Sequence, residues 1–137
     1  MRKVLVFGTF DIIHPGHLNF LKEAKKHGDF LIVVVARDLT VKTIKGSFPD
    51  NTEQKRLSDV KKLGIADKIL LGNIEDKYKV IEEIRPDVIC LGYDQNSFTQ
   101  NLDVELLKRK VQARTIRLPP YKHERYKSSK IKIQKYK

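Results

Sequence analysis

The sequence contains very little cysteine, which limits the kinds of site it can build. Of its 137 residues only Cys90 is a cysteine, so the chain offers no internal disulfide and no set of thiolates for zinc. Cys90 also stands inside an apolar run, where we expect an unreactive core thiol. A lone buried cysteine is typical of a protein from a reducing compartment.

Long apolar runs are missing as well. No run approaches the roughly 18 residues that a membrane-spanning helix needs. The first residues, MRKVLVFG, lead directly into a strand-like segment without the apolar stretch and cleavage site of a secretory signal. Internal repeats and low-complexity linkers are also missing. We therefore expect one domain over residues 1–137, in the cytoplasm and with no membrane partner.

Acidic residues are scarce only near the C-terminus. Residues 1–107 hold equal numbers of basic and acidic residues, so residues 108–137 carry the whole net charge of +11. Such a segment can be a solvated terminus, can bind an anionic small molecule, or can bind RNA with Tyr121, Tyr126 and Tyr136 as stacking groups. A nucleic-acid-binding module is the remote alternative, because it leaves the N-terminal motif unexplained.

Short β-branched runs alternate with segments of helical period along the chain. We expect strands at 3–8, 30–36, 68–72, 87–92 and 114–118. We expect helices at 17–28, 53–63, 77–84 and 102–110. This alternation predicts an α/β fold, a single doubly wound Rossmann-like domain with a five-stranded parallel sheet and a short C-terminal helix. Ligands of such sheets bind at the carboxyl ends of the strands.

The segment FGTFDIIHPGH, residues 7–17, joins the first expected strand to the first expected helix. Gly8 allows a sharp turn, and Pro15 and Gly16 suit the first turn of a helix. The unpaired N–H groups of a helix start bind anions, and His14 and His17 can add hydrogen bonds to phosphate. Two other interpretations stay open: a partial zinc site, and helix-start histidines without a role.

GTFDIIHPGH resembles the GTFDxxHxGH signature of the cytidylyltransferase-like nucleotidyltransferases. The similarity continues through residues 28–46, 52–56 and 85–95, which resemble the second strand with its lysine-bearing segment, an arginine-bearing helix, and the nucleotide-binding loop of that family. The resemblance implies transfer of a nucleotidyl group from an NTP to a phosphorylated acceptor. Pyrophosphate is released, a divalent metal such as Mg²⁺ assists, and the protein is a homodimer.

The resemblance also implies roles for particular residues. The catalytic residues would be His14, His17 and Lys45. The nucleotide would contact Thr9, Phe10, His14, Pro15, Gly16, His17, Asp94, Tyr121, Ser128 and Ser129. The acceptor would contact Asp11, Asp38, Lys42 and Arg56. No residue is assigned as a resident metal ligand, and an acceptor phosphate that is already ionised needs no general base.

Three acceptors compete within the family. Glycerol-3-phosphate cytidylyltransferases share the signature but typically carry RTxGISTT near the end, where this chain has LPPYKHERYKSSKIK, residues 118–132. The segment VKTIKG also occurs in heptose-phosphate adenylyltransferases. The segments VARDLTVKTIKG and LGYDQ and the serine pair after a Tyr-Lys resemble the archaeal FAD synthases, which adenylate FMN. We therefore expect AMP transfer from ATP, or CMP transfer from CTP, to FMN, with the basic segment 119–137 completing the active site.

Overall fold

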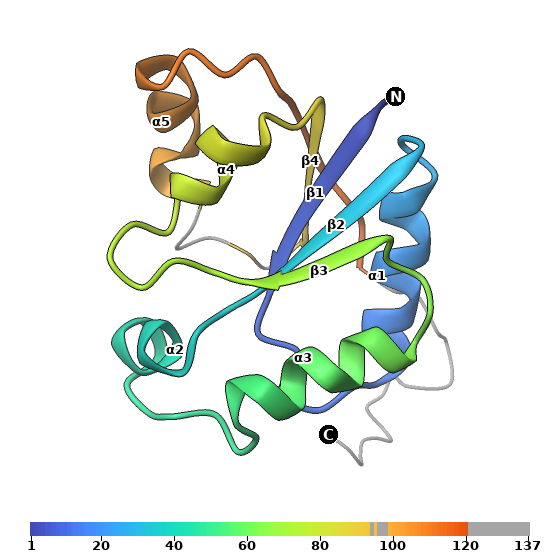
Figure 1. The fold of residues 1–137 in the computed structure, drawn as a ribbon, viewed down its shortest axis with the longest axis vertical. Helices are drawn as coiled ribbons and strands as arrows, with labels where there is room; N and C mark the ends of the chain where they lie inside the picture. The colour runs from blue at the N-terminus through green and yellow to red at the C-terminus, as the bar shows by residue number, and fades with distance from the viewer. Residues whose placement is uncertain (94, 96–98, 121–137) are drawn as a thin grey trace.

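The computed structural model describes residues 1–93, 95 and 99–120 (Figure 1). In chain order its elements are β1 (Lys3–Gly8), α1 (Pro15–Lys25), β2 (Phe30–Val35), α2 (Asp38–Lys45), α3 (Glu53–Lys62), β3 (Lys68–Leu71), α4 (Lys79–Ile84), β4 (Val88–Leu91), the 3₁₀ turn η1 (Thr99–Asn101), α5 (Leu102–Lys108) and β5 (Arg114–Arg117).

The five strands form one parallel sheet in the order β3-β2-β1-β4-β5. Strand β1 lies between β2 and β4, and its Val6 stands opposite Val33 on one side and Cys90 on the other. The strand order therefore reverses at β1, which makes the crevice between the carboxyl ends of β1 and β4 the expected ligand site. The α/β class and the five-stranded parallel sheet predicted from the sequence are confirmed.

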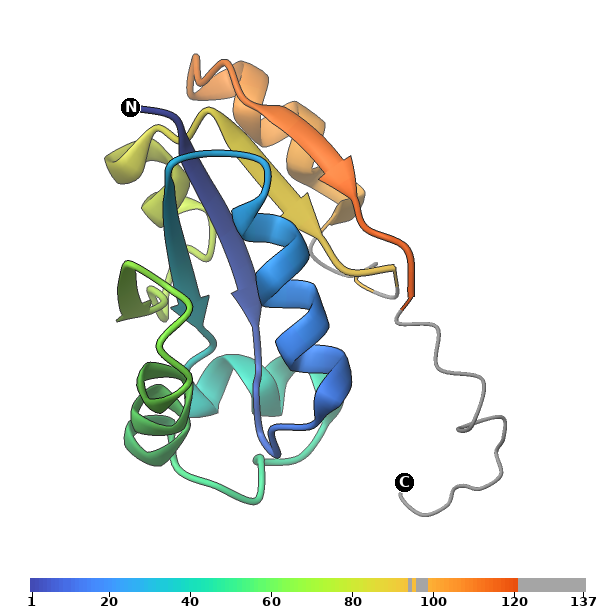
Figure 2. The same cartoon turned by 90° about the vertical axis from the view of Figure 1, so that its right-hand side faces the viewer.

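Two apolar layers hold helices against the two faces of the sheet. On one face Leu21 and Ala24 of α1 and Val60 of α3 pack against alternate strand residues such as Val4 and Val33. On the other face α4 and α5 pack against the remaining strand residues, with Ile81 as a fully enclosed example. Figure 2 shows α1 lying along its face and β5 at the outer edge. This arrangement leaves the carboxyl ends of the strands to the loops and to α2.

Helix α2 was not among the expected elements. The helix is only eight residues long, and four of them, Thr40, Val41, Thr43 and Ile44, are β-branched residues that favour strands over helices. The helix ends at Gly46, whose left-handed φ of 87° suits a residue without Cβ. Helix α1 also ends at Lys25, three residues before the expected stop at Gly28. The expected C-terminal helix lies outside the described residues.

Cys90 lies in β4 with no exposed surface. Burial raises the pKa of its thiol to about 11, so the thiol is protonated and unreactive at neutral pH. Among the described helices, none has the length and apolar character that crossing a bilayer requires.

Candidate active site

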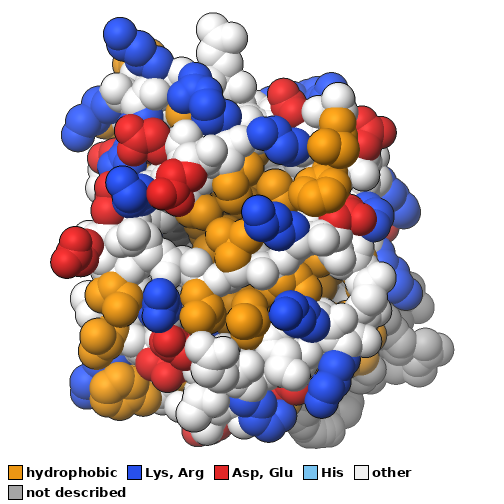
Figure 3. Space-filling model, viewed as in Figure 1, with side chains coloured by type: hydrophobic (Ala, Val, Ile, Leu, Met, Phe, Trp, Pro, Cys, Tyr) orange, Lys and Arg blue, Asp and Glu red, His pale blue; other side chains and the backbone are white. Residues whose placement is uncertain are grey.

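A cavity of about 1160 Å³ opens at the carboxyl ends of the strands. Its walls come from the turn between β1 and α1, from α2 and the loop after it, and from the segments that follow β3, β4 and β5. Figure 3 shows a hollowed region with apolar side chains in its middle and Lys and Arg side chains around it. The cavity thus lies where the strand order predicts a ligand.

The turn after β1 has a strained backbone at Phe10, and the ring of Phe10 packs against Gly8 of the same turn. Phe10 adopts a left-handed φ of 54°, which is rare for a bulky residue, and its ring is 2% exposed within the core. A Cβ on Gly8 would stand 2.5 Å from Cε2 of that ring, so glycine is required here. The ring of Phe10 fills the space that a side chain on Gly8 would occupy. Phe10 therefore forms the floor of the cavity.

His14 and His17 cap helix α1 and contact each other. The Nδ1 of His14 accepts the N–H of Gly16 at 3.1 Å, and the Nδ1 of His17 accepts the N–H of His14 at 3.2 Å. These two bonds form a capping box in which histidines take the usual places of Ser and Glu. The rings stack with centroids 3.9 Å apart. The pair thus has a structural role in addition to the expected chemical one.

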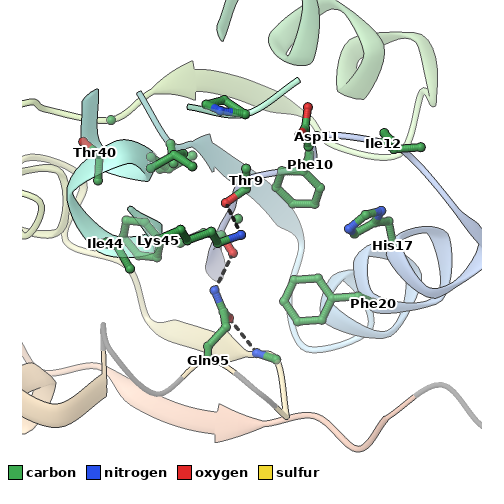
Figure 4. Close-up of a pocket in the computed structure, with 18 of the residues that line it drawn as sticks. Thr9, Phe10, Asp11, Ile12, His17, Phe20, Thr40, Ile44, Lys45 and Gln95 are labelled. Carbon is green, nitrogen blue, oxygen red and sulfur yellow. Dashed lines mark hydrogen bonds between the residues drawn. The ribbon is translucent and has the colours of Figure 1, made fainter. Parts of the chain in front are cut away.

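The capping bonds also determine where the protons lie. An Nδ1 that accepts a hydrogen bond leaves the proton of a neutral imidazole on Nε2, so both rings carry Nε2–H donors. Partial desolvation lowers the pKa of His14 below its ordinary value. Both histidines and the helix start line the cavity, with His17 seen beside Phe10 in Figure 4. Neutral imidazole donors at a helix N-terminus suit a phosphate.

Lys45 reaches the cavity from the last turn of α2. Its Nζ lies 3.4 Å from Oγ1 of Thr9, and Figure 4 shows it extending towards the β1 turn. Both residues line the cavity. The structure thus brings together Thr9, Lys45 and the two histidines, as the resemblance implies.

Asp11 lines the cavity but is bound by the chain itself. Its two carboxylate oxygens accept the backbone N–H groups of Asp50 and Asn51, each at 2.8 Å. Burial acts to raise the pKa of Asp11, but these donors outweigh it and hold the pKa below its ordinary value. Asp11 therefore anchors the loop after α2, and whether it also contacts an acceptor stays a prediction.

Arg56 and Asp38 bind each other beside the β1 turn. Arg56 has no exposed surface, and its guanidinium donates to Asp38 Oδ1 at 2.7 Å, Thr9 O at 2.8 Å and Asn51 O at 3.0 Å. Neither Arg56 nor Asp38 is among the residues that line the cavity. A buried cation needs such partners, and here they come from the protein. Arg56 therefore supports the β1 turn, and whether it also contacts the acceptor stays a prediction.

Lys42 also lies outside the cavity lining. Its Nζ is 5.4 Å from the ring centroid of Phe48 and 3.4 Å from Gly46 O. Phe48 itself lines the cavity and is 56% exposed. Lys42 thus holds an aromatic ring of the rim by a cation–π contact, which spacing alone could not predict.

The sequence interpretation missed several lining residues. Phe48 and Lys77 belong to no recognised motif, whereas Ile44 and Gln95 stand within VKTIKG and LGYDQ but were given no role; all four line the cavity. Residue type alone did not distinguish them from their neighbours. Four expected nucleotide contacts, Asp94, Tyr121, Ser128 and Ser129, lie outside the described residues.

A metal held by protein alone is not supported by the described ranges. Residues 1–93, 95 and 99–120 contain no group of three His, Cys, Asp or Glu side chains that could hold an ion. Mg²⁺ that enters with a triphosphate needs only one or two carboxylates besides phosphate and water. Asp11 and Asp50 line the cavity, so the donor set suits an ion brought by the substrate.

Two relatives of known name match most of the chain. The FAD synthase of Methanosarcina barkeri is 48% identical over 119 residues, which are 87% of this chain and 84% of the relative. The FAD synthase of Ferroglobus placidus is 49% identical over 118 residues, 86% of this chain and 76% of the relative.

Solved structures agree with the fold. The lipopolysaccharide core biosynthesis protein of Thermoplasma volcanium has a TM-score of 0.82 and 38% identity, covering 89% of this chain and 99% of that one. Pantoate-beta-alanine ligase of Francisella tularensis, at 15% identity and a TM-score of 0.63, shares the fold over 90% of this chain and 60% of that one. Residues 5–134 match the family described as cytidylyltransferase-like, and the chain belongs to that family.

Proposed function

We propose that the protein is an FAD synthase, a nucleotidyltransferase that transfers AMP from ATP, or CMP from CTP, to FMN. The named relatives support this assignment, since they match the chain at 48% and 49% identity. The observation that carries it is an apolar and aromatic half of the cavity next to the phosphate-binding helix start. Residues 119–137 completing the site, a homodimer and a cytoplasmic location stay predictions from the sequence.

The reaction needs alignment and charge stabilisation more than proton transfer. An ionised phosphate oxygen of FMN attacks the α-phosphorus of the NTP, and a new P–O bond forms. The bond from that phosphorus to the α–β bridging oxygen breaks, and its electron pair leaves with pyrophosphate. The Nε2–H groups of His14 and His17, the N-terminal N–H groups of α1 and the cation of Lys45 stabilise the developing charge. A divalent ion held by the triphosphate, with Asp11 and Asp50 nearby, would neutralise part of that charge.

The cavity holds space for two substrates. Its volume of about 1160 Å³ exceeds the roughly 300–1,000 Å³ of a pocket for one drug-sized ligand. Val41 and Ile44 of α2 and Phe48 of the loop after it line the cavity, and Phe7 and Val34 line it from β1 and β2. A three-ring isoalloxazine would bury this surface, whereas a sugar or glycerol would leave it in contact with water. The lining therefore favours FMN over the other acceptors of the family.

Replacing Phe48 by alanine should raise the KM for FMN about tenfold, since aromatic stacking contributes roughly 1–3 kcal/mol and 1.4 kcal/mol is a factor of ten. The KM for ATP should stay within twofold. Leu39→Ala is the matched control, because Leu39 is 52% exposed on α2 but does not line the cavity. Steady-state FAD formation at varied FMN measures both variants. An equal change in the KM for FMN in the two variants would show that Phe48 does not contact the flavin.

A panel of acceptors and nucleotides tests the function itself. The protein is incubated with Mg²⁺, with ATP or CTP, and with FMN, glycerol-3-phosphate or a heptose phosphate, and products are separated by chromatography. Of the three acceptors, we expect only FMN to react, giving a flavin dinucleotide and one pyrophosphate for each dinucleotide formed. A sugar nucleotide product would favour the second candidate, which the name of the Thermoplasma volcanium protein supports. No dinucleotide from FMN with either NTP would reject FAD synthase.

A further inference from the structure

The loop after β4 is tied to β1 by one side chain. Gln95 accepts the N–H of Gly92 through Oε1 at 2.7 Å and donates from Nε2 to Phe7 O at 2.9 Å (Figure 4). Strands β1 and β4 are the pair at which the strand order reverses. Gln95 therefore spans the crevice in which ligands of doubly wound sheets bind.

A second side chain holds the same loop from the outer strand. Arg117, the last residue of β5, donates from Nη1 to Gly92 O at 2.6 Å and to Tyr93 O at 3.2 Å, and from Nη2 to Gln95 O at 3.3 Å. Gly92, Tyr93 and Gln95 line the cavity, but Arg117 does not. The planar guanidinium of arginine directs several N–H groups at fixed angles and can bind several carbonyls at once. The ammonium group of lysine is a rotatable point charge and fixes their positions less well. Arg117 thus determines how the backbone of this loop is presented to the cavity.

The position of the loop indicates which substrate it serves. The apolar lining on the α2 side suits the flavin, so the part of the cavity beside β4 is left for the nucleotide. That part is bordered by Gly92, Tyr93 and Gln95, and Tyr93 is 58% exposed. An exposed aromatic ring is suited to stacking on the face of a base.

We propose that Arg117 is a positioning residue for the nucleotide, acting through the carbonyl groups of Gly92, Tyr93 and Gln95. The proposal rests on the proposed function for the identity of the two substrates. It adds a residue outside the cavity, from the edge strand, to those that determine nucleotide affinity.

Arg117→Ala tests the proposal against Arg114→Ala. Arg114 is at the other end of β5, is exposed, and uses its backbone N–H to bond Asp87 O at 3.0 Å. We expect Arg117→Ala to raise the KM for ATP about tenfold, corresponding to roughly 1.4 kcal/mol. The KM for FMN and the thermal midpoint should match those of Arg114→Ala.

Two further variants test the contacts of the same loop. The KM for ATP of Arg117→Lys should fall between those of wild type and Arg117→Ala. Gln95→Glu, which loses the donor to Phe7 O, should also raise the KM for ATP.

Titration calorimetry with ATP alone separates this proposal from the function. If the protein makes no FAD, the function fails, and the change in ATP dissociation constant still tests Arg117. An unchanged ATP affinity in Arg117→Ala would overturn the proposal. So would a fall in kcat and thermal midpoint without a change in KM, because that result describes a purely structural arginine.

Discussion

Replacing His14 by asparagine is expected to reduce FAD formation by about 100- to 1000-fold, the usual cost of removing one transition-state donor. Asparagine is among the best N-cap residues, and its Oδ1 takes the place of Nδ1 in accepting the N–H of Gly16. Its amide is too short to replace the Nε2–H donor. The free energy of unfolding, measured in urea, should therefore change by less than about 0.5 kcal/mol. His17→Asn should behave in the same way, since its oxygen can accept the N–H of His14.

Alanine variants of the two histidines provide the comparison. They remove the cap as well as the donor, so they should also lose about 1 kcal/mol of stability. Turnover near the wild-type value in His14→Asn would show that its Nε2–H does not act in the transition state. Parallel losses of stability and turnover in all four variants would identify a pair that only shapes the helix start.

Replacing Arg56 by methionine should cost the protein about 3 kcal/mol of stability, at the lower end of the range for breaking a buried ion pair. Arg56 is fully buried, whereas the side chain of its partner Asp38 is 31% exposed and can regain water. The change also leaves Thr9 O and Asn51 O without this donor. Urea unfolding measures the loss, and the residual folded enzyme should keep its KM for FMN.

Lys55→Met is the matched control for Arg56→Met. Lys55 is the preceding residue of α3, is 58% exposed in its side chain and pairs with Asp59 at 2.9 Å. An exposed pair at this spacing contributes about 0.3–0.5 kcal/mol, so the control should be nearly as stable as wild type. If Arg56→Met were equally stable but had a raised KM for FMN, Arg56 would return to the substrate-binding residues.

The fold was largely predictable from the sequence because its signals are local. Runs such as residues 30–36 are apolar at every position, which indicates a strand covered on both faces, and the segments between the runs have a helical period. Helix α2 was not predicted because it is short and half of its residues are β-branched, which favours a strand. Its start is stabilised by a tertiary contact, because Glu53 of α3 accepts the backbone N–H of Asp38, the first residue of α2, at 2.8 Å.

The candidate site also has one part that could be predicted from the sequence and another that could not. The turn and helix start were predictable as local structure because Gly8, His14, Pro15, Gly16 and His17 stand close together in the sequence, and their binding of phosphate stays a prediction. The acceptor residues were not predictable from type alone. Asp38 and Arg56 have the charges that phosphate and metal binding require, but the same charges satisfy each other when burial removes water.

The sequence by itself determined most strands and helices and the turn before α1, since each depends on residues only a few positions apart, and the alternation of strands and helices indicated a parallel sheet. The tertiary structure decided which distant residues meet at that turn. Lys45 reaches Thr9 across 36 positions, Arg56 reaches Thr9 across 47, and Gln95 reaches Phe7 across 88. These contacts exist because parallel strands bring their carboxyl ends to one edge of the sheet, and the order of the strands in the sheet decides which ends become neighbours.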